Sequence, residues 1–163
     1  MSRPLLLALL LVLQPVATQA DQLQYLGSFH NVSSKDSGEH CAGYSVGLWR
    51  YRDRVLGLLD VHEGLCGDPP CGVIKDASLD SRTGRLRFWS SITGQKIQFQ
   101  GTLTREVIDG AFNGERARLA RVQDRMYFEP DRSILAWCKF WSSVPRCSGV
   151  RELCESINVQ GSK

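Results

Sequence analysis

Ser45, Asp60 and His62 are the side chains whose types and spacing come closest to catalytic chemistry. The alternating segments 43–51 and 54–63 predict a hairpin in which Ser45 faces Asp60, with His62 on the same side as Asp60. A serine, a histidine and an aspartate on one face are the groups of a Ser-His-Asp hydrolase. A serine nucleophile usually stands on a sharp turn, however, and the chain contains no G-x-S-x-G motif. We therefore favour a hydrogen-bonded polar group at the rim of the fold and keep a hydrolase as the alternative.

Metal chemistry has little support in the sequence. His30, His40 and His62 are the three histidines, and none of them has H-x-H or H-x-x-x-H spacing. The cysteines lack the paired short spacings of a zinc site. No pair of carboxylates stands out as the acid and base of a glycosidase. We expect neither a metal nor a cofactor.

Two other places are candidates for binding. Trp89 falls on the polar side of its predicted strand, where an exposed aromatic side chain can contact a partner. The loop that contains Asp68, Pro69 and Pro70 lies between two cysteines, and a rigid closed loop loses little entropy on binding. The same loop would equally serve as a staple without a binding role.

A basic cluster and a glycosylation sequon complete the candidates. Arg116, Arg118, Arg121 and Arg125 could contact an acidic partner, but a solvated strand face is favoured because the net charge is only +3. Asn31 begins an Asn-Val-Ser sequon, which matters if the source is a eukaryote.

The first residues have the pattern of a secretory signal peptide. Arg3 precedes the apolar stretch Leu5–Leu13, and Thr18 and Ala20 place small residues before a cleavage site after residue 20. The apolar stretch is too short for a helix to cross a bilayer core about 30 Å thick. We expect export to the periplasm or the extracellular space, with no membrane span.

The chain contains six cysteines, all of them beyond this leader. An even number in an exported chain predicts up to three disulfides. Cys66 and Cys71 enclose a proline-bent loop, which favours a local bridge between them. Cys41 would then bind the C-terminal segment, and that segment would close on itself, with the pairing among the remaining cysteines left open. These cysteines are Cys41, Cys138, Cys147 and Cys154.

The middle of the chain predicts an antiparallel meander. A turn at Thr93-Gly94 makes Leu86 face Gly101 and Phe88 face Phe99. The next turn, at Arg105-Glu106, makes Gly101 face Gly110, so the apolar stripe continues without a change of register. Facing glycines in adjacent strands indicate a sharp bend, as at a barrel corner.

The remaining segments complete a barrel of about eight strands. Both faces of the 43–63 hairpin are partly apolar, so we expect it to be covered on both sides. Further strands are expected at residues 22–29, 73–79, 115–122 and 125–128, although 115–122 would also suit a helix. After Pro130, apolar residues recur at helical spacing behind Asp131 and Ser133 as caps.

These observations define an all-β protein. It comprises a leader (1–20), an antiparallel β-barrel domain (21–129) and a helical, disulfide-linked C-terminal flap of the same domain (130–163). Charged residues make up 23% of the chain and hydrophobic residues 42%, which excludes disorder, and the near balance of charge gives no case for a nucleic-acid partner.

The stretch Gly101–Phe112 resembles the strand–turn–strand rhythm of avidin-like and other small exported barrels. The resemblance covers architecture alone, and the polar ligand-binding positions of avidins have no counterpart here, so it implies no biotin site.

We therefore expect an exported, non-catalytic binding module that holds a small ligand or docks on an extracytoplasmic protein, for example as an inhibitor. The barrel mouth and the 66–71 loop are the expected contact points. The alternatives are a hydrolase that uses Ser45, Asp60 and His62, or a structural envelope or cell-surface protein.

Overall fold

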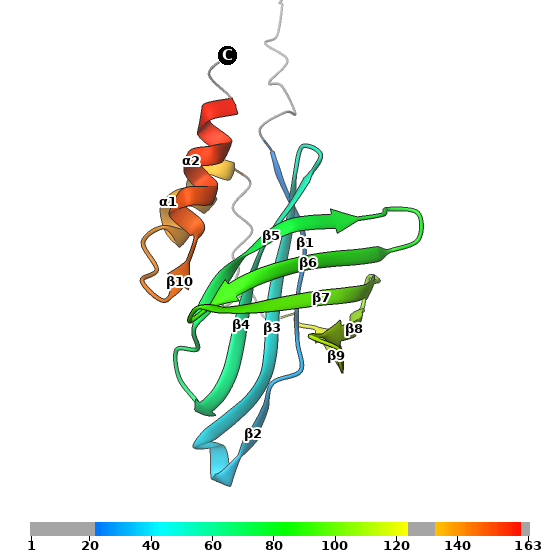
Figure 1. The fold of residues 1–163 in the computed structure, drawn as a ribbon, viewed down its shortest axis with the longest axis vertical. Helices are drawn as coiled ribbons and strands as arrows, with labels where there is room; N and C mark the ends of the chain where they lie inside the picture. Colours follow the sequence, from blue (N-terminus) through cyan, green and yellow to red (C-terminus); the bar gives the residue numbers. More distant parts are fainter. Residues whose placement is uncertain (1–21, 124–132, 161–163) are drawn as a thin grey trace, which may run out of the picture.

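The structure is a computed structural model that describes residues 22–123 and 133–160. Most of these residues lie in β-strands, and two helices follow near the end of the chain (Figure 1). In chain order the elements are β1 (Leu23–His30), β2 (Ser33–Lys35), the 3-10 turn η2 (Asp36–Gly38), β3 (His40–Tyr51), β4 (Arg54–Leu65), β5 (Cys71–Leu79), β6 (Arg85–Ile92), β7 (Gln95–Leu103), β8 (Val107–Phe112), β9 (Glu115–Arg121), α1 (Ile134–Trp141), β10 (Cys147–Ser148) and α2 (Val150–Gln160).

Eight of these strands form a closed barrel. Neighbouring strands follow the order β1-β9-β8-β7-β6-β5-β4-β3, and β3 pairs back with β1. All the pairings within this ring are antiparallel, as the sequence predicts. The short strand β2 extends β3 outside the ring, and β10 runs parallel to β5. The predicted all-β barrel with a disulfide-tied helical C-terminal segment is confirmed.

The predicted hairpin registers are confirmed residue by residue. Ser45 pairs with Asp60, Phe88 with Phe99, and Gly101 with Gly110. Segment 115–122, for which the sequence permits a strand or a helix, forms β9. Its alternating buried residues face the interior, which favours a strand because a helix would scatter them around its axis.

The inside of the barrel is filled by apolar side chains, which we call the inner core. Phe88 and Phe99 stack with ring centres 5.0 Å apart, and Phe99 contacts Phe112 at 4.9 Å. The Phe99 ring lies over the facing glycines: a Cβ at Gly101 would be 2.7 Å from Phe99 Cζ, and one at Gly110 would be 2.8 Å from it. The glycines therefore make room for an aromatic ring where β7 and β8 approach closely.

The barrel closes between β1 and β9 through a short ladder. Only two residue pairs, Phe29 with Arg121 and His30 with Ala120, connect the strands. The Arg121 side chain reinforces this seam, because its Nη2 donates a 2.7 Å hydrogen bond to the carbonyl of Leu26 and its Nε donates to the carbonyl of Arg105. Its guanidinium also lies 4.9 Å from the centre of the Phe29 ring.

The two helices cover one flank of the barrel beside β4 and β5 (Figure 1). They bury a second cluster, the outer core, against the outer surface of β3, β4 and β5. Trp49 of β3 and Trp137 of α1 meet there with ring centres 5.6 Å apart. The 43–63 hairpin is therefore covered on both sides, as predicted. Ser133 occupies the N-cap position of α1 but makes no capping hydrogen bond through its side chain.

Three predictions fall outside the described residues: the leader 1–20, the strand 125–128 and the helix cap Asp131. Within 22–123 and 133–160, neither helix combines the length and the apolar character needed to cross a membrane.

Candidate functional site

A row of polar side chains crosses the outer surface of the barrel where the outer core ends. Strand pairing places His30 of β1 beside Ser45 of β3, and Ser45 beside Asp60 of β4. His62 follows two residues after Asp60 and faces the same way, since strand side chains alternate between faces. The predicted face shared by Ser45, Asp60 and His62 is thus present, and His30 joins it.

These residues line a cleft of about 620 Å³ on the barrel wall, which we call the outer-wall cleft. Its volume lies within the range of small-molecule sites, roughly 300–1,000 Å³. The lining combines convergent polar groups with apolar surface. The residues are Ser28, Phe29, His30, Val32, Ser34, Cys41, Ser45, Asp60, His62, Cys66, Gly67, Pro69, Val122 and Arg146.

Ser45 and His62 form a hydrogen bond, with 3.1 Å between Ser45 Oγ and His62 Nε2. Burial lowers the pKa of His62 below its usual value, and electrostatic repulsion from Arg146 and from His30 lowers it further. The ring is therefore neutral at neutral pH, and its Nε2 can accept the Ser45 hydroxyl proton when Nδ1 carries the hydrogen.

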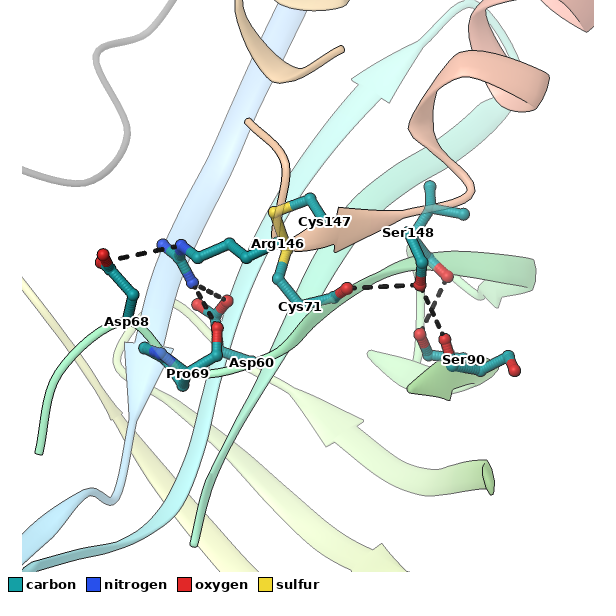
Figure 2. Close-up of a disulfide and its surroundings, with 10 residues drawn as sticks. Asp60, Asp68, Pro69, Cys71, Ser90, Arg146, Cys147 and Ser148 are labelled. Carbon is teal, nitrogen blue, oxygen red and sulfur yellow. Dashed lines mark hydrogen bonds and ion pairs between the residues drawn. A yellow bond between two sulfur atoms is a disulfide. The ribbon is translucent and has the colours of Figure 1, made fainter. Parts of the chain in front are cut away.

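Asp60 is bonded to Arg146 and not to His62. Arg146 Nη1 donates a 3.0 Å hydrogen bond to Asp60 Oδ1 and a 2.8 Å bond to the carbonyl of Pro69, while its Nε lies 3.9 Å from Asp68 Oδ1 (Figure 2). Burial raises the pKa of Asp60 to about 6, although Arg146 opposes that rise by its charge and its hydrogen bond. A Ser-His-Asp triad would need Asp60 to orient the His62 ring, and this contact is missing between the two described side chains.

Disulfides hold both ends of the 66–71 loop, but with a pairing that differs from the predicted one. Cys66 bonds Cys41, and Cys71 bonds Cys147, so the predicted Cys66–Cys71 bridge is wrong, as is the link from Cys41 to the C-terminal segment. The reason is the length of the β3–β4 hairpin, which continues to Leu65 and brings Cys66 beside Cys41.

The C-terminal segment is closed on itself by the Cys138–Cys154 disulfide between α1 and α2, as predicted. Three disulfides indicate an oxidising environment outside the cytoplasm.

The group of described residues that gathers metal-ligand atoms does not form a metal centre. Atoms of Asp60, Cys71 and Cys147 lie within 4.8 Å of one another. Both sulfurs are in the Cys71–Cys147 disulfide and carry no thiolate, which is the form that binds metals. His40 lies apart from this group, with its Nδ1 3.3 Å from Asp36 Oδ2.

The predicted binding residues separate into two places. Pro69 lines the outer-wall cleft, Asp68 is exposed beside Arg146, and the Pro70 carbonyl accepts a 3.2 Å hydrogen bond from the Val61 N–H. Trp89 lies on the outer surface of β6, two strands further round the barrel from β4.

The three described arginines of the predicted cluster do not form one basic patch. Arg116 and Arg118 share Asp109, at 3.9 Å and 3.5 Å respectively, on the outer wall. Arg121 closes the β1–β9 seam, and Arg125 lies outside the described residues.

Asn31, the first residue of the predicted sequon, is exposed, and its Oδ1 accepts a 2.8 Å hydrogen bond from the Tyr44 N–H.

Sequence reasoning missed Arg146 and His30 as cleft residues. His30 directly follows the expected strand 22–29, for which the sequence predicts no partner strand; its pairing with Ser45 becomes visible only in the structure. Arg146 had no local signal, because its role depends on the C-terminal segment folding back over β4, across 86 residues.

The fold and the site define a small, disulfide-stabilised antiparallel β-barrel with a helical flap. No protein-family model, curated protein or solved structure matches the chain.

Proposed function

We propose that this protein is an exported, non-catalytic binding module that holds a small organic ligand in the outer-wall cleft. The observation that carries the proposal is the cleft itself, a ligand-sized hollow in which polar groups converge on one side. Export is supported by the leader pattern of residues 1–20 and by the three disulfides.

The lining favours a ligand with an apolar body and a polar end group. Val32, Pro69 and Val122 offer apolar contact, and the Ser45–His62 pair offers a donor and an acceptor. The Cys41–Cys66 and Cys71–Cys147 disulfides fix the walls, so little conformational entropy is lost on binding. Because the inner core fills the barrel, the outer wall is a better place for a ligand than the barrel interior.

The test uses 8-anilinonaphthalene-1-sulfonate, which has apolar rings and a polar sulfonate. We expect saturable binding by fluorescence to the folded protein, and its loss in Ser45→Trp or His30→Trp, each of which places a large ring in the cleft. Thr102→Trp, on the exposed outer surface of β7, should bind like the wild type. Circular dichroism establishes that each variant is folded. Absence of saturable binding, or equal binding by folded cleft variants, would overturn the proposal.

A hydrolase is the second candidate, favoured by the 3.1 Å Ser45–His62 hydrogen bond inside a cleft. In that mechanism His62 Nε2 takes the proton of Ser45 while Oγ attacks the carbonyl carbon of an ester. The ester C–O bond breaks, the alcohol leaves with that proton, and water then hydrolyses the acyl-enzyme to release the acid. Labelling of Ser45 by a fluorophosphonate, lost in His62→Gln, would replace the binding proposal with this one. We expect no labelling, because Asp60 is bonded to Arg146 and does not orient the imidazole.

A further inference from the structure

A second surface with binding chemistry lies on the outer wall of β5, β6 and β7, away from the outer-wall cleft. Trp89 is its centre, half-buried on β6. The ammonium nitrogens of Lys75 and Lys96 each lie 5.0 Å from the centre of its ring. The indole N–H donates a 2.7 Å hydrogen bond to Asp76 Oδ2. The ring thereby holds two lysine side chains in place on a rigid sheet.

Strand pairing extends this surface sideways. β6 and β7 place Gln98 beside Trp89 and Gln100 beside Arg87, and β8 places Ala111 beside Gln100. A shallow groove of about 610 Å³ runs over these residues, and Ala111, with its short side chain, is part of its lining. Its lining residues are Asp76, Arg87, Phe88, Trp89, Gln98, Phe99, Gln100, Ala111, Asn113 and Gly114.

The charges along the groove favour an anion. The groove itself is lined by one cation, Arg87, and one acidic residue, Asp76. Lys75 and Lys96 are exposed cations that the Trp89 ring holds at its edge, so the basic groups outnumber the acidic one. The Asp76 carboxylate already accepts the indole hydrogen bond. The outer wall of β8 adds no excess of negative charge, since Asp109 is shared by Arg116 and Arg118.

From this arrangement we propose that the groove, which we call the Trp89 groove, binds an anionic polysaccharide. The carboxylate or sulfate groups of such a chain pair with Lys75, Lys96 and Arg87, and the guanidinium of Arg87 can bind them in a bidentate manner. The amides of Gln98 and Gln100 can both donate to and accept from sugar hydroxyls. A sheet surface is rigid, so binding orders side chains alone.

A single-stranded nucleic acid is the competing partner for a basic surface with an aromatic residue. Its bases would need an open aromatic face for stacking. The Trp89 ring already has two lysine ammonium groups against it, at 5.0 Å each. This favours contact with anionic groups over base stacking, and therefore the polysaccharide.

The test measures binding of heparin, a carboxylated and sulfated polysaccharide, by isothermal titration. Neutral dextran and oligo-dT are run in parallel. The variant Lys75→Gln/Arg87→Gln/Lys96→Gln removes the cation that lines the groove and the two that lie against Trp89 at its edge. The matched control Lys35→Gln/Lys139→Gln/Arg151→Gln removes three exposed cations elsewhere.

We expect the groove variant to bind heparin at least about tenfold more weakly and the control to change less than about twofold. Trp89→Leu should also weaken binding, because the lysines lose their support. Dextran should not bind. Equal losses in the two triple variants would mean general charge attraction and overturn the proposal. So would oligo-dT that binds more tightly than heparin and depends on the same residues.

Discussion

Arg146 and Asp60 join the C-terminal segment to the barrel wall by a hydrogen-bonded ion pair 3.0 Å long. Asp60 is 8% exposed, so the pair lies largely out of water. The next residue, Cys147, forms a disulfide with Cys71, which pairs with Asp60 across β4 and β5. The ion pair and the disulfide thus attach the same short segment to the same point of the barrel.

Replacement of one member of this pair should destabilise the fold more than replacement of both. Arg146→Met leaves Asp60 buried without its partner, and we expect a loss of roughly 3–5 kcal/mol in the free energy of unfolding. Asp60→Leu/Arg146→Met should recover part of it, although the Arg146 bond to the Pro69 carbonyl is still lost. Chemical denaturation of the wild type, Asp60→Leu, Arg146→Met and the double variant completes a double-mutant cycle that measures the coupling. Strictly additive losses would mean that the pair does not act as a unit.

Asp60 should also make stability depend on pH. Its pKa in the folded protein is about 6, above the usual value near 3.9, so the folded state binds the proton more strongly than the unfolded state. The free energy of unfolding should therefore fall as the pH rises from about 4 to about 6, by an amount on the order of 2 kcal/mol. Asp60→Asn should remove this decrease with rising pH. An unchanged slope in a folded variant would show that another group is responsible.

His62 should contribute a slope of opposite sign. Its pKa is lowered in the folded protein, so the unfolded state binds the proton more strongly and stability rises with pH up to about 6.5. Near pH 6 the contributions of Asp60 and His62 therefore oppose each other. When His62→Gln removes the opposing contribution, the free energy of unfolding should fall more steeply with increasing pH. Thermal unfolding between pH 4 and 7 tests this. The variant Asp60→Asn/His62→Gln is the control, and its curve should be flatter than that of either single variant.

The hairpins could be predicted because their registers depend on local alternation. Phe88 and Phe99 face each other across a two-residue turn, and a shift by one residue would expose both. The same alternation places Ser45 opposite Asp60 from the sequence alone, and the structure has this pair.

The contacts of the candidate site could not be predicted in this way, because they join distant segments. The proline-bent loop suits a Cys66–Cys71 bridge as well as the observed pairing. The extension of β4 to Leu65 decides between them by placing Cys66 beside Cys41. The bond from Arg146 to Asp60 depends on how the flap docks, and sequence spacing contains no information on docking.

The corner at Gly101 should not tolerate a side chain. A Cβ there would lie 2.6 Å from Gly110 Cα and 2.7 Å from Phe99 Cζ, and backbone cannot move aside cheaply. We expect Gly101→Ala to cost at least about 1–3 kcal/mol, as overpacking does. Gly67→Ala is the matched control, since nothing lies within 4 Å of its Cβ position, and it should be nearly neutral. Equal melting temperatures for the two variants would contradict the close approach of β7 and β8.

The Cys71–Cys147 disulfide, which links the C-terminal segment to β5, should contribute more to the free energy of unfolding than the Cys138–Cys154 disulfide within that segment. Cys71 and Cys147 are 76 residues apart, whereas Cys138 and Cys154 are 16 apart. Since a longer closed loop restricts the unfolded chain more, Cys71→Ala/Cys147→Ala should cost about 4–5 kcal/mol and Cys138→Ala/Cys154→Ala about 3 kcal/mol.

The two disulfide variants should also differ in which part of the chain a protease cuts first. Without Cys71–Cys147, the flap keeps its internal bridge but loses its covalent link to β5, so limited proteolysis should cut first around residues 133–160. Without Cys138–Cys154, the segment remains attached to β5 through Cys147. Peptide mapping without reduction identifies the pairs in the wild type beforehand. Recovery of a Cys66–Cys71 peptide would contradict the pairing, and a larger loss for the Cys138–Cys154 variant would contradict the order.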